Sequence, residues 1–162
     1  MQLSINRESL LKAINLIAKA ADKRHDMVIL GNIKLQLSEG ALILTASDLE
    51  VELTSTLKLP AGACIEAGTT TLPATKLRDI CKSLPSQAQV NLTTQENERC
   101  LLTSGKSRFT LGTLPSEDYP SLGNPENITP LTISRSRLTD LIHKTQFAMA
   151  IQDVRYYLTG ML

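Results

Sequence analysis

Few residues in this sequence combine a reactive side chain with the neighbours that chemistry would need. His25 and His143 lie far from any further set of metal ligands, and Cys64, Cys81 and Cys100 are odd in number and widely spaced. Zinc sites and disulfide frameworks need closely spaced ligands or paired cysteines, so we interpret all three cysteines as small buried hydrophobic residues. The sequence contains no glycine-rich phosphate loop and no serine in a nucleophile elbow. We therefore expect no enzyme activity, no bound metal ion and no cofactor.

One group of carboxylates has a regular spacing. Asp48, Glu50 and Glu52 alternate with apolar residues along a strand expected at 49–53, which would put three carboxylates on one face. Carboxylate oxygens in this arrangement could bind a hard cation such as Ca²⁺. Antiparallel strands commonly have one solvated polar face, and we favour that interpretation.

Basic residues are concentrated in three segments with a helical pattern. Residues 7–24, 75–83 and 134–145 together carry eleven Lys or Arg and four Asp or Glu, a net charge of +7. The rest of the chain carries six basic and twelve acidic residues, a net charge of −6, although the whole chain is nearly neutral at +1. A basic set of helices would attract a polyanion. The alternative is that exposed helix positions favour Lys and Arg because of their helix propensity.

The helical segments belong to a repeated unit. Residues 3–14 match residues 131–142 at a constant offset of 128, and a fainter copy begins near Thr71 at an offset of 67. Each copy predicts a short strand followed by an amphipathic helix, with Asn6 and Ser134 as N-caps of the first and last helices. A supersecondary unit that returns at a long period indicates a modular, pseudo-symmetric architecture.

Around these helices we expect antiparallel strands in an α+β fold. The expected strand positions are 1–6, 28–37, 41–46, 49–53, 69–72, 89–93, 99–104 and 106–112. They complete two β-α-β-β-β modules, residues 1–59 and 66–114, with the helices on one side and the antiparallel sheets on the other.

A linker rich in proline, glycine and acidic residues ends the first domain, which we place at 1–125. Residues 126–162 are then expected to begin a second domain, with a strand at 131–133, a helix, and another strand from Val154. Because this segment lacks partners to complete a sheet, we expect the sequence to be the front part of a longer natural chain.

Composition limits the environment of the protein. With 42% hydrophobic residues, a chain of 162 residues can bury a real core. No run approaches the roughly 20 apolar residues of a membrane helix, and the N-terminus lacks the pattern of a signal peptide. We therefore expect a cytoplasmic protein that has no membrane partner.

Several longer stretches are specific enough to suggest a family. They are Ile29-Leu30-Gly31-Asn32, residues 44–50 (LTASDLE), residues 104–109 (SGKSRF), Thr113-Leu114-Pro115 with Asp118 and Pro120, and residues 146–162 (QFAMAIQDVRYYLTGML). With these stretches the sequence resembles the bacterial DNA polymerase III beta subunits, the sliding clamps. The match is spread over all 162 residues. It implies a DNA-clamp fold, and specifically the first domain and the opening of the second domain of a protomer with three domains.

The resemblance also implies a function. Two protomers would close into a ring whose basic helices line the hole, so that the ring attracts duplex DNA without reading its sequence. Such a processivity factor tethers the replicative polymerase and raises its effective concentration at the template. The implied partners are double-stranded DNA, a second protomer, the catalytic subunit of DNA polymerase III, the clamp loader, and other polymerases and repair proteins. The alternative function is a protein-interaction module that does not encircle DNA.

The resemblance assigns roles to particular residues. The positions that match DNA contacts in the family are Arg24, Gln152, Tyr156 and Tyr157, and Lys12, Lys19 and Lys23 are expected to add diffuse attraction. Arg24 and Gln152 are also 128 residues apart, so they occupy equivalent connectors in the repeat. The family commonly has a proline-containing turn after Arg24, whereas this chain has Asp26 near the proposed contact.

Two further surfaces follow from the resemblance. The dimer contact would fall on the last strand of the first domain, where basic residues flank an apolar centre, here Lys76, Arg99, Lys106, Arg108, Phe109 and Leu111. Phe109 could instead be a core residue. A cleft for partner peptides would begin with Arg155, Tyr157 and Leu158, and most of it would lie beyond Leu162.

Overall fold

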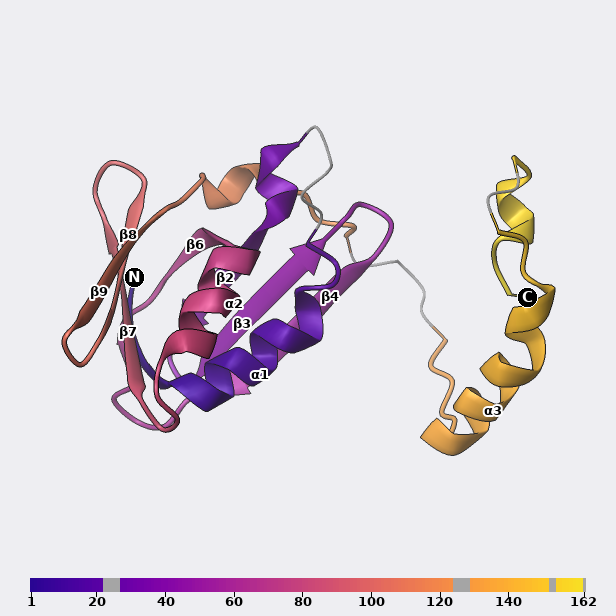
Figure 1. The fold of residues 1–162 in the computed structure, drawn as a ribbon, viewed down its shortest axis with the longest axis horizontal. Helices are drawn as coiled ribbons and strands as arrows, with labels where there is room; N and C mark the ends of the chain where they lie inside the picture. The colour runs from indigo at the N-terminus through magenta and orange to yellow at the C-terminus, as the bar shows by residue number, and fades with distance from the viewer. Residues whose placement is uncertain (22–26, 124–128, 152–153, 162) are drawn as a thin grey trace. The chain divides into compact units, whose positions relative to one another are not determined.

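Short runs of alternating apolar and polar residues make up much of Met1–Gly123, and these runs form antiparallel strands. The computed structural model describes residues 1–21, 27–123, 129–151 and 154–161 (Figure 1). The chain divides into two compact units, Met1–Gly123 and Asn124–Leu162.

The described part of the first unit contains nine strands, two α-helices and two short 3₁₀ helices. The strands are β1 (Gln2–Asn6), β2 (Asn32–Ser38), β3 (Ala41–Ser47), β4 (Glu52–Lys58), β5 (Cys64–Glu66), β6 (Gly68–Pro73), β7 (Gln89–Gln95), β8 (Arg99–Ser104) and β9 (Ser107–Gly112). The helices are α1 (Arg7–Ile17), η1 (Val28–Gly31), α2 (Ala74–Ser83) and η2 (Ser116–Asp118). In the second unit, the described helices are α3 (Arg135–Thr145), η3 (Gln146–Ala148) and η4 (Tyr156–Leu158).

The nine strands form two antiparallel sheets that exchange strands between the two sequence modules. One sheet has the order β5-β1-β7-β8-β9, and the other has the order β4-β3-β2-β6. β1 of the first module pairs with β7 of the second, with Ile5 opposite Val90. In the equivalent pairing, β6 of the second module pairs with β2 of the first, with Leu72 opposite Ile33. The predicted α+β class is confirmed, but each sheet is built from both modules.

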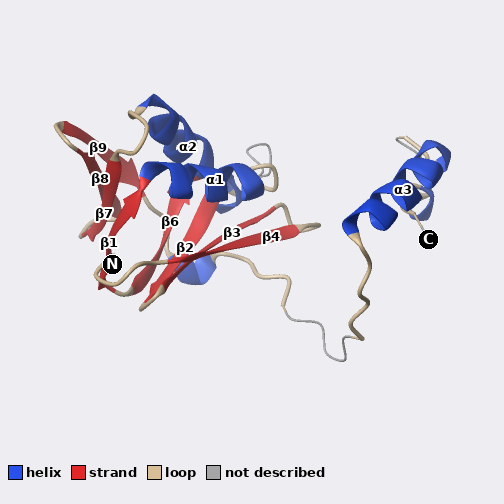
Figure 2. Cartoon of the chain, turned by 90° about the horizontal axis from the view of Figure 1, so that it is seen from below, coloured by secondary structure: helices blue, strands red, loops and turns tan. Residues whose placement is uncertain are grey.

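The two long helices of the first unit lie side by side against the β4-β3-β2-β6 sheet, α1 on β3 and β4 and α2 on β6 (Figures 1 and 2). α1 begins where the side chain of Asn6 accepts hydrogen bonds from the N–H groups of Glu8, at 2.9 Å, and Ser9, at 3.4 Å, which confirms the predicted N-cap. The residues of α1 that are buried in the core are Leu10, Ala13, Ile14 and Ile17. This helical spacing leaves a polar stripe on the opposite face.

Two segments after α1 differ from the sequence prediction. Residues 28–31 form η1 instead of the start of a strand, and β2 begins only at Asn32. The short strand β5, which the sequence analysis missed, pairs with β1 at the edge of its sheet. Three residues are too few for a visible alternation of apolar and polar side chains, so only the pairing with β1 defines this strand.

The predicted strand at 49–53 is also wrong at its start. Asp48 Oδ1 accepts hydrogen bonds from the N–H groups of Glu50, at 3.0 Å, and Val51, at 2.7 Å, and so closes a tight turn. β4 therefore begins at Glu52, and the three carboxylates expected on one strand face do not share one.

The second unit repeats the helix of the first. α3 begins and ends 128 residues after α1, and Ser134 Oγ accepts a hydrogen bond from the N–H of Arg137 at 3.4 Å, which confirms the second predicted N-cap. The described residues contain no strand at 131–133 or after Val154, so both of these predictions are wrong. A strand needs a partner for its backbone N–H and C=O groups, and the described part of this unit supplies none. Residues 156–158 instead form η4, the counterpart of the first turn of η1.

The cysteines are free thiols in different environments. Cys81 and Cys100 are buried as predicted, whereas Cys64 is only partly buried. Within the ranges given above, the structure has no helix that is both long enough and apolar enough to cross a membrane.

Candidate functional site

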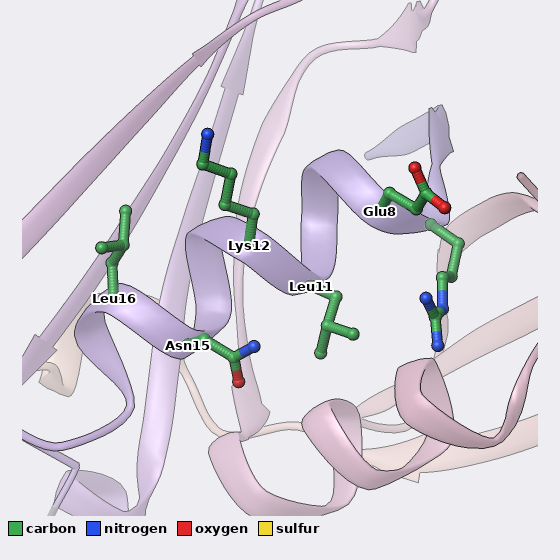
Figure 3. A pocket seen from close by; sticks show the side chains of 6 residues that line it. Glu8, Leu11, Lys12, Asn15 and Leu16 are labelled. Carbon is green, nitrogen blue, oxygen red and sulfur yellow. The ribbon is translucent and has the colours of Figure 1, made fainter. Parts of the chain in front are cut away.

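The exposed stripe of α1 carries the first group of predicted site residues. Lys12 is exposed on this stripe with Glu8 and Asn15, and Lys19 continues the stripe in the turn that follows the helix. The stripe is exposed because the buried apolar residues of α1 point into the core. An open depression of about 440 Å³ lies along the helix and is lined by Arg7, Glu8, Leu11, Lys12, Asn15 and Leu16. In Figure 3 the Lys12 side chain extends away from α2, whereas Leu11 points toward it. The site is therefore an open charged surface, and it lacks the enclosure of a small-molecule pocket.

Arg7 contributes to the same face in a different way, which the sequence analysis did not foresee. Its Nε donates a hydrogen bond to the carbonyl oxygen of Cys81 at 2.6 Å, and its Nη2 donates to the carbonyl oxygen of Lys82 at 3.1 Å. These carbonyls belong to the last turn of α2, where unpaired C=O groups and the helix dipole favour a cation. Arg7 thus joins the start of α1 to the end of α2.

α2 adds further basic residues to the surface of the first unit. Lys76 and Lys82 are exposed, while Arg78 forms an ion pair with the neighbouring Asp79 at 3.4 Å. An exposed ion pair of this kind contributes little to stability, and it also lowers the net charge that this part of the helix presents. Lys12, Lys76 and Lys82 are therefore the exposed lysines of the two packed helices, and Lys19 is exposed just after α1.

The basic residues of α3 lie in the second unit. Arg135, Arg137 and Lys144 are all exposed on this helix. Leu138 and Leu141, which correspond to core positions of α1, are 46% and 50% exposed. α3 thus keeps the apolar stripe of the repeat, whereas its basic residues occupy other positions than Lys12 and Lys19.

The connectors that follow α1 and α3 hold the other predicted DNA contacts. Lys23, Arg24 and Gln152 lie outside the described residues, as does Asp26. Tyr156 and Tyr157 lie in η4, and the Tyr157 side chain is 67% exposed. All of these assignments stay predictions.

The predicted peptide-cleft residues lie in and beside η4. Leu158 donates its N–H to the carbonyl oxygen of Arg155 at 2.9 Å, and its own carbonyl accepts from the N–H of Ala150 at 2.9 Å. These bonds bring Ala150 and Arg155 beside Leu158, whose side chain is 37% exposed. The role of Arg155, Tyr157 and Leu158 in peptide binding stays a prediction.

The predicted dimer residues lie on and around β9, an edge strand that pairs only with β8 among the described strands. Lys106 and Arg108 are exposed at one end of the β8-β9 hairpin, and Arg99 is exposed at the other end, opposite Gly112. Lys76 reaches the surface from α2.

The two apolar members of this group differ in exposure. Phe109 is half-buried and packs against the core, and Leu111 is buried at 6% exposure. Phe109 could therefore contact a partner directly, whereas Leu111 would mainly hold the strand in place. The dimer assignment stays a prediction.

The described His, Cys, Asp and Glu side chains are scattered over the molecule or buried in the core. Across the described ranges, no three His, Cys, Asp or Glu side chains come together as metal ligands. The N–H of Val51 holds the pKa of Asp48 below its usual value, so this carboxylate stays charged as the cap of an exposed turn. Burial raises the pKa of Cys81 to about 11, and burial has the same effect on Cys100, so neither thiol is an activated nucleophile.

Comparison with known proteins gives one consistent result. The family model of the DNA polymerase III beta subunit, N-terminal domain, matches residues 1–123. Over 162 residues, all of this chain, the sequence is 44% identical to the beta sliding clamp of Pseudomonas putida strain KT2440 and 43% identical to that of Escherichia coli strain K12. The chain covers 43% of the length of each of these relatives.

Solved structures agree with the sequence comparison. A crystal structure of the DNA polymerase III subunit beta from Pseudomonas aeruginosa has a TM-score of 0.93 at 43% identity, over 99% of this chain and 43% of that chain. The pol III beta of Caulobacter crescentus has a TM-score of 0.91 at 32% identity, over 99% of this chain and 42% of that chain. The fold and the sequence therefore point to the same group of proteins, of which this chain spans less than half the length.

Proposed function

Because the chain belongs to the DNA polymerase III beta subunit family, we propose that it acts as part of a DNA sliding clamp. In this proposal, residues 1–125 are the first clamp domain and residues 126–162 are the opening of the second. The protein would be a ring-shaped, non-catalytic processivity factor that encircles duplex DNA without sequence specificity. The single observation that carries the proposal is a family match that coincides with a basic stripe on two packed helices.

The physical mechanism is electrostatic attraction combined with topology. Lys12 in α1, Lys19 just after it, and the exposed basic residues of α3 would face the phosphates of the duplex, with Arg24 and Gln152 reaching it from the connectors. Phosphate contacts carry no sequence information and exchange readily along the backbone, so they hold the duplex while still allowing sliding. The ring itself, and not the strength of these contacts, would keep the clamp on DNA.

Ring closure would use the exposed edge of β9. An edge strand presents unpaired N–H and C=O groups, and here half-buried Phe109 and exposed Arg108 lie beside that edge. An apolar centre with basic neighbours suits a second protomer that offers an apolar strand with acidic neighbours. The proposed state is a homodimer of the full-length protein.

The clamp would work in the cytoplasm by tethering other proteins to DNA. The cleft that begins with Arg155, Tyr157 and Leu158 would take short peptides from the catalytic subunit of DNA polymerase III, from the clamp loader, and from other polymerases and repair proteins. Tethering turns each rebinding of the polymerase into an intramolecular event, which raises its effective concentration.

The direct test uses the natural full-length protein loaded on nicked circular DNA. A ring is retained on the circle in high salt and is lost when a restriction enzyme linearises the DNA, because it then slides off the ends. Equal retention on circular and linear DNA would reject encirclement and favour the alternative, a protein-interaction module without a topological link to DNA.

A second test concerns the basic stripe. The double variant Lys12→Glu/Lys19→Glu is expected to weaken DNA association and to reduce the slope of log affinity against log salt by about 2, one for each lost phosphate contact. Lys58→Glu is the control, because it reverses the charge of one exposed lysine on β4 that is not part of the stripe, and the effect of each single variant, Lys12→Glu and Lys19→Glu, is compared with it. An unchanged slope in the double variant would show that these lysines do not contact phosphates.

A further inference from the structure

Residues 113–123, which follow β9, are held against the rest of the first unit by hydrogen bonds between buried polar groups. Tyr119, which follows η2, is only 5% exposed although it belongs to a connecting segment rich in acidic residues and proline. Its hydroxyl accepts a hydrogen bond from the N–H of Ser47 at 3.1 Å and donates one to the carbonyl oxygen of Asn32 at 3.2 Å. One side chain thus contacts the end of β3 and the start of β2.

A second set of bonds continues from the same asparagine. Asn32 Nδ2 donates to Thr71 Oγ1 at 3.0 Å, which links β2 to β6. Thr71 Oγ1 also accepts from the N–H of Leu114 at 3.0 Å and donates to the carbonyl oxygen of Leu114 at 2.9 Å. The connecting segment is therefore held at two points, Leu114 and Tyr119, by one network that passes through Asn32.

Burial makes this network strong relative to an exposed one. Asn32, Ser47 and Thr71 are 6%, 1% and 0% exposed, so water cannot easily replace a lost partner. Across the described residues, no buried side-chain nitrogen or oxygen lacks a hydrogen-bond partner. Removing one hydroxyl would leave a backbone N–H and a carbonyl of this network unpaired.

The position of Asn32 gives the network a functional meaning. Asn32 directly follows η1, which is the described end of the connector between α1 and β2. This connector carries Arg24, a proposed DNA contact. The same network therefore holds the end of the connector and the course of the segment that leads toward the second unit.

We propose that Tyr119 is a positioning residue, which fixes the segment 113–123 and the η1 end of the DNA-contact connector in one arrangement. We call the network of Tyr119, Asn32, Ser47, Thr71 and Leu114 the Tyr119 clasp. Its local effect on the fold is independent of DNA, whereas its effect on DNA retention rests on the proposed clamp function. The clasp makes the positions of segment 113–123 and of the η1 end of the connector interdependent.

The first experiment measures hydrogen exchange by mass spectrometry on the protein without DNA. Tyr119→Phe removes one oxygen and keeps the ring, so the fold is expected to persist. We expect roughly three- to tenfold faster exchange in peptides that cover residues 28–34, 45–49 and 113–123, with the rest of the unit unchanged. Thr56→Val is the matched control, because it removes a hydroxyl from an exposed position of the same sheet that pairs with Ile43, outside the three peptides.

Thr71→Val tests the other end of the clasp. It is expected to speed exchange in the same three peptides, and the double variant with Tyr119→Phe should add less than the sum of the two, because both act through Asn32. Unchanged exchange in Tyr119→Phe, or an equal increase across the whole first unit, would overturn the clasp.

The positioning role is tested on the full-length protein with circular DNA. Tyr119→Phe is expected to shorten retention on the circle while the salt dependence stays at the wild-type value, because no phosphate contact is lost. Wild-type retention combined with faster exchange would overturn the positioning role. A failure of the clamp proposal looks different, since the wild-type protein itself would then show no preference for circular DNA.

Discussion

Arg7 Nε lies 2.6 Å from the carbonyl oxygen of Cys81, and this hydrogen bond joins the first residue of α1 to the last turn of α2. A second bond from the same guanidinium to the carbonyl of Lys82 completes a fork over the end of that helix. Arg7 thus stabilises the packing of the two helices whose exposed lysines form the proposed DNA-facing surface.

Arg7→Gln is expected to lower the free energy of unfolding by about 1–2 kcal/mol, because two charge-assisted hydrogen bonds to α2 are lost. Arg7→Lys should recover only part of this loss, since a lysine keeps the charge but not the planar fork. Urea denaturation of the two variants measures both effects. Arg78→Gln is the control, because its exposed ion pair with Asp79 contributes little, and an equally large loss there would contradict the assigned role of Arg7.

Asn6→Ala is expected to destabilise the first unit by about 1 kcal/mol, because the N–H groups of Glu8 and Ser9 lose their acceptor. Asn6→Asp should restore most of the stability, since a carboxylate accepts the same bonds and suits the positive end of the helix dipole. Thermal unfolding followed by circular dichroism reports both variants. Equal stability of Asn6→Ala and the wild type would mean that the cap contributes nothing.

Stability is expected to fall in alkaline solution because of three buried groups. Burial raises the pKa of Cys81 and of Cys100 from 9.0 to about 11, and it raises the pKa of Tyr119 above 10.0. Above these ordinary values the unfolded chain loses the protons more readily than the folded one. The stabilisation is therefore complete below about pH 9 and is lost as the pH rises through the folded pKa values.

Urea denaturation between pH 7 and pH 11 measures this alkaline loss. Cys100→Ala is expected to flatten the curve above pH 9, because one of the raised thiols is gone. Cys64→Ala is the matched control, since it removes a thiol that is only partly buried. A curve for Cys100→Ala that is as steep as that of the wild type would contradict the assignment.

Arg108→Glu is expected to weaken dimerisation of the full-length protein by at least about tenfold, because it reverses a charge beside the free edge of β9. Sedimentation velocity over a range of concentrations measures the change. Arg108 is exposed, so the variant should unfold at the wild-type temperature, which separates a lost interface from a damaged fold. Lys58→Glu on β4 is the control, and a dimer that resists Arg108→Glu would place the protomer contact elsewhere.

The sequence by itself determined the structural elements that are stabilised by interactions between residues close together in the chain. Asn6 and Ser134 could be recognised as caps because the hydrogen bonds they accept reach only two or three positions along the chain. α3 begins and ends 128 residues after α1, as the repeat predicts, because apolar residues have a similar spacing in the two helices. The alternation of side chains in 89–112 similarly predicted the hairpins of β7, β8 and β9.

Turns with polar side chains were harder to predict from the same patterns. The alternation from Asp48 to Glu52 looks like a strand, but the Asp48 carboxylate closes a turn with backbone N–H groups. Periodicity describes only which side chains are apolar, so it cannot show that a side-chain acceptor competes with sheet pairing.

Tertiary structure decided everything that depends on residues far apart in the chain. The pairing of β1 with β7 and of β6 with β2 places each strand in the sheet of the other module, and no local pattern distinguishes that arrangement from two separate sheets. In the sequence, Arg7 is one of several basic residues with no special role. Only the fold shows that it bonds to Cys81 of α2, 74 residues away. The bonds of Tyr119 span 72 and 87 residues, so its burial follows from the closure of the whole unit. A sequence shows which groups can donate or accept, but only the packed fold decides which of them meet.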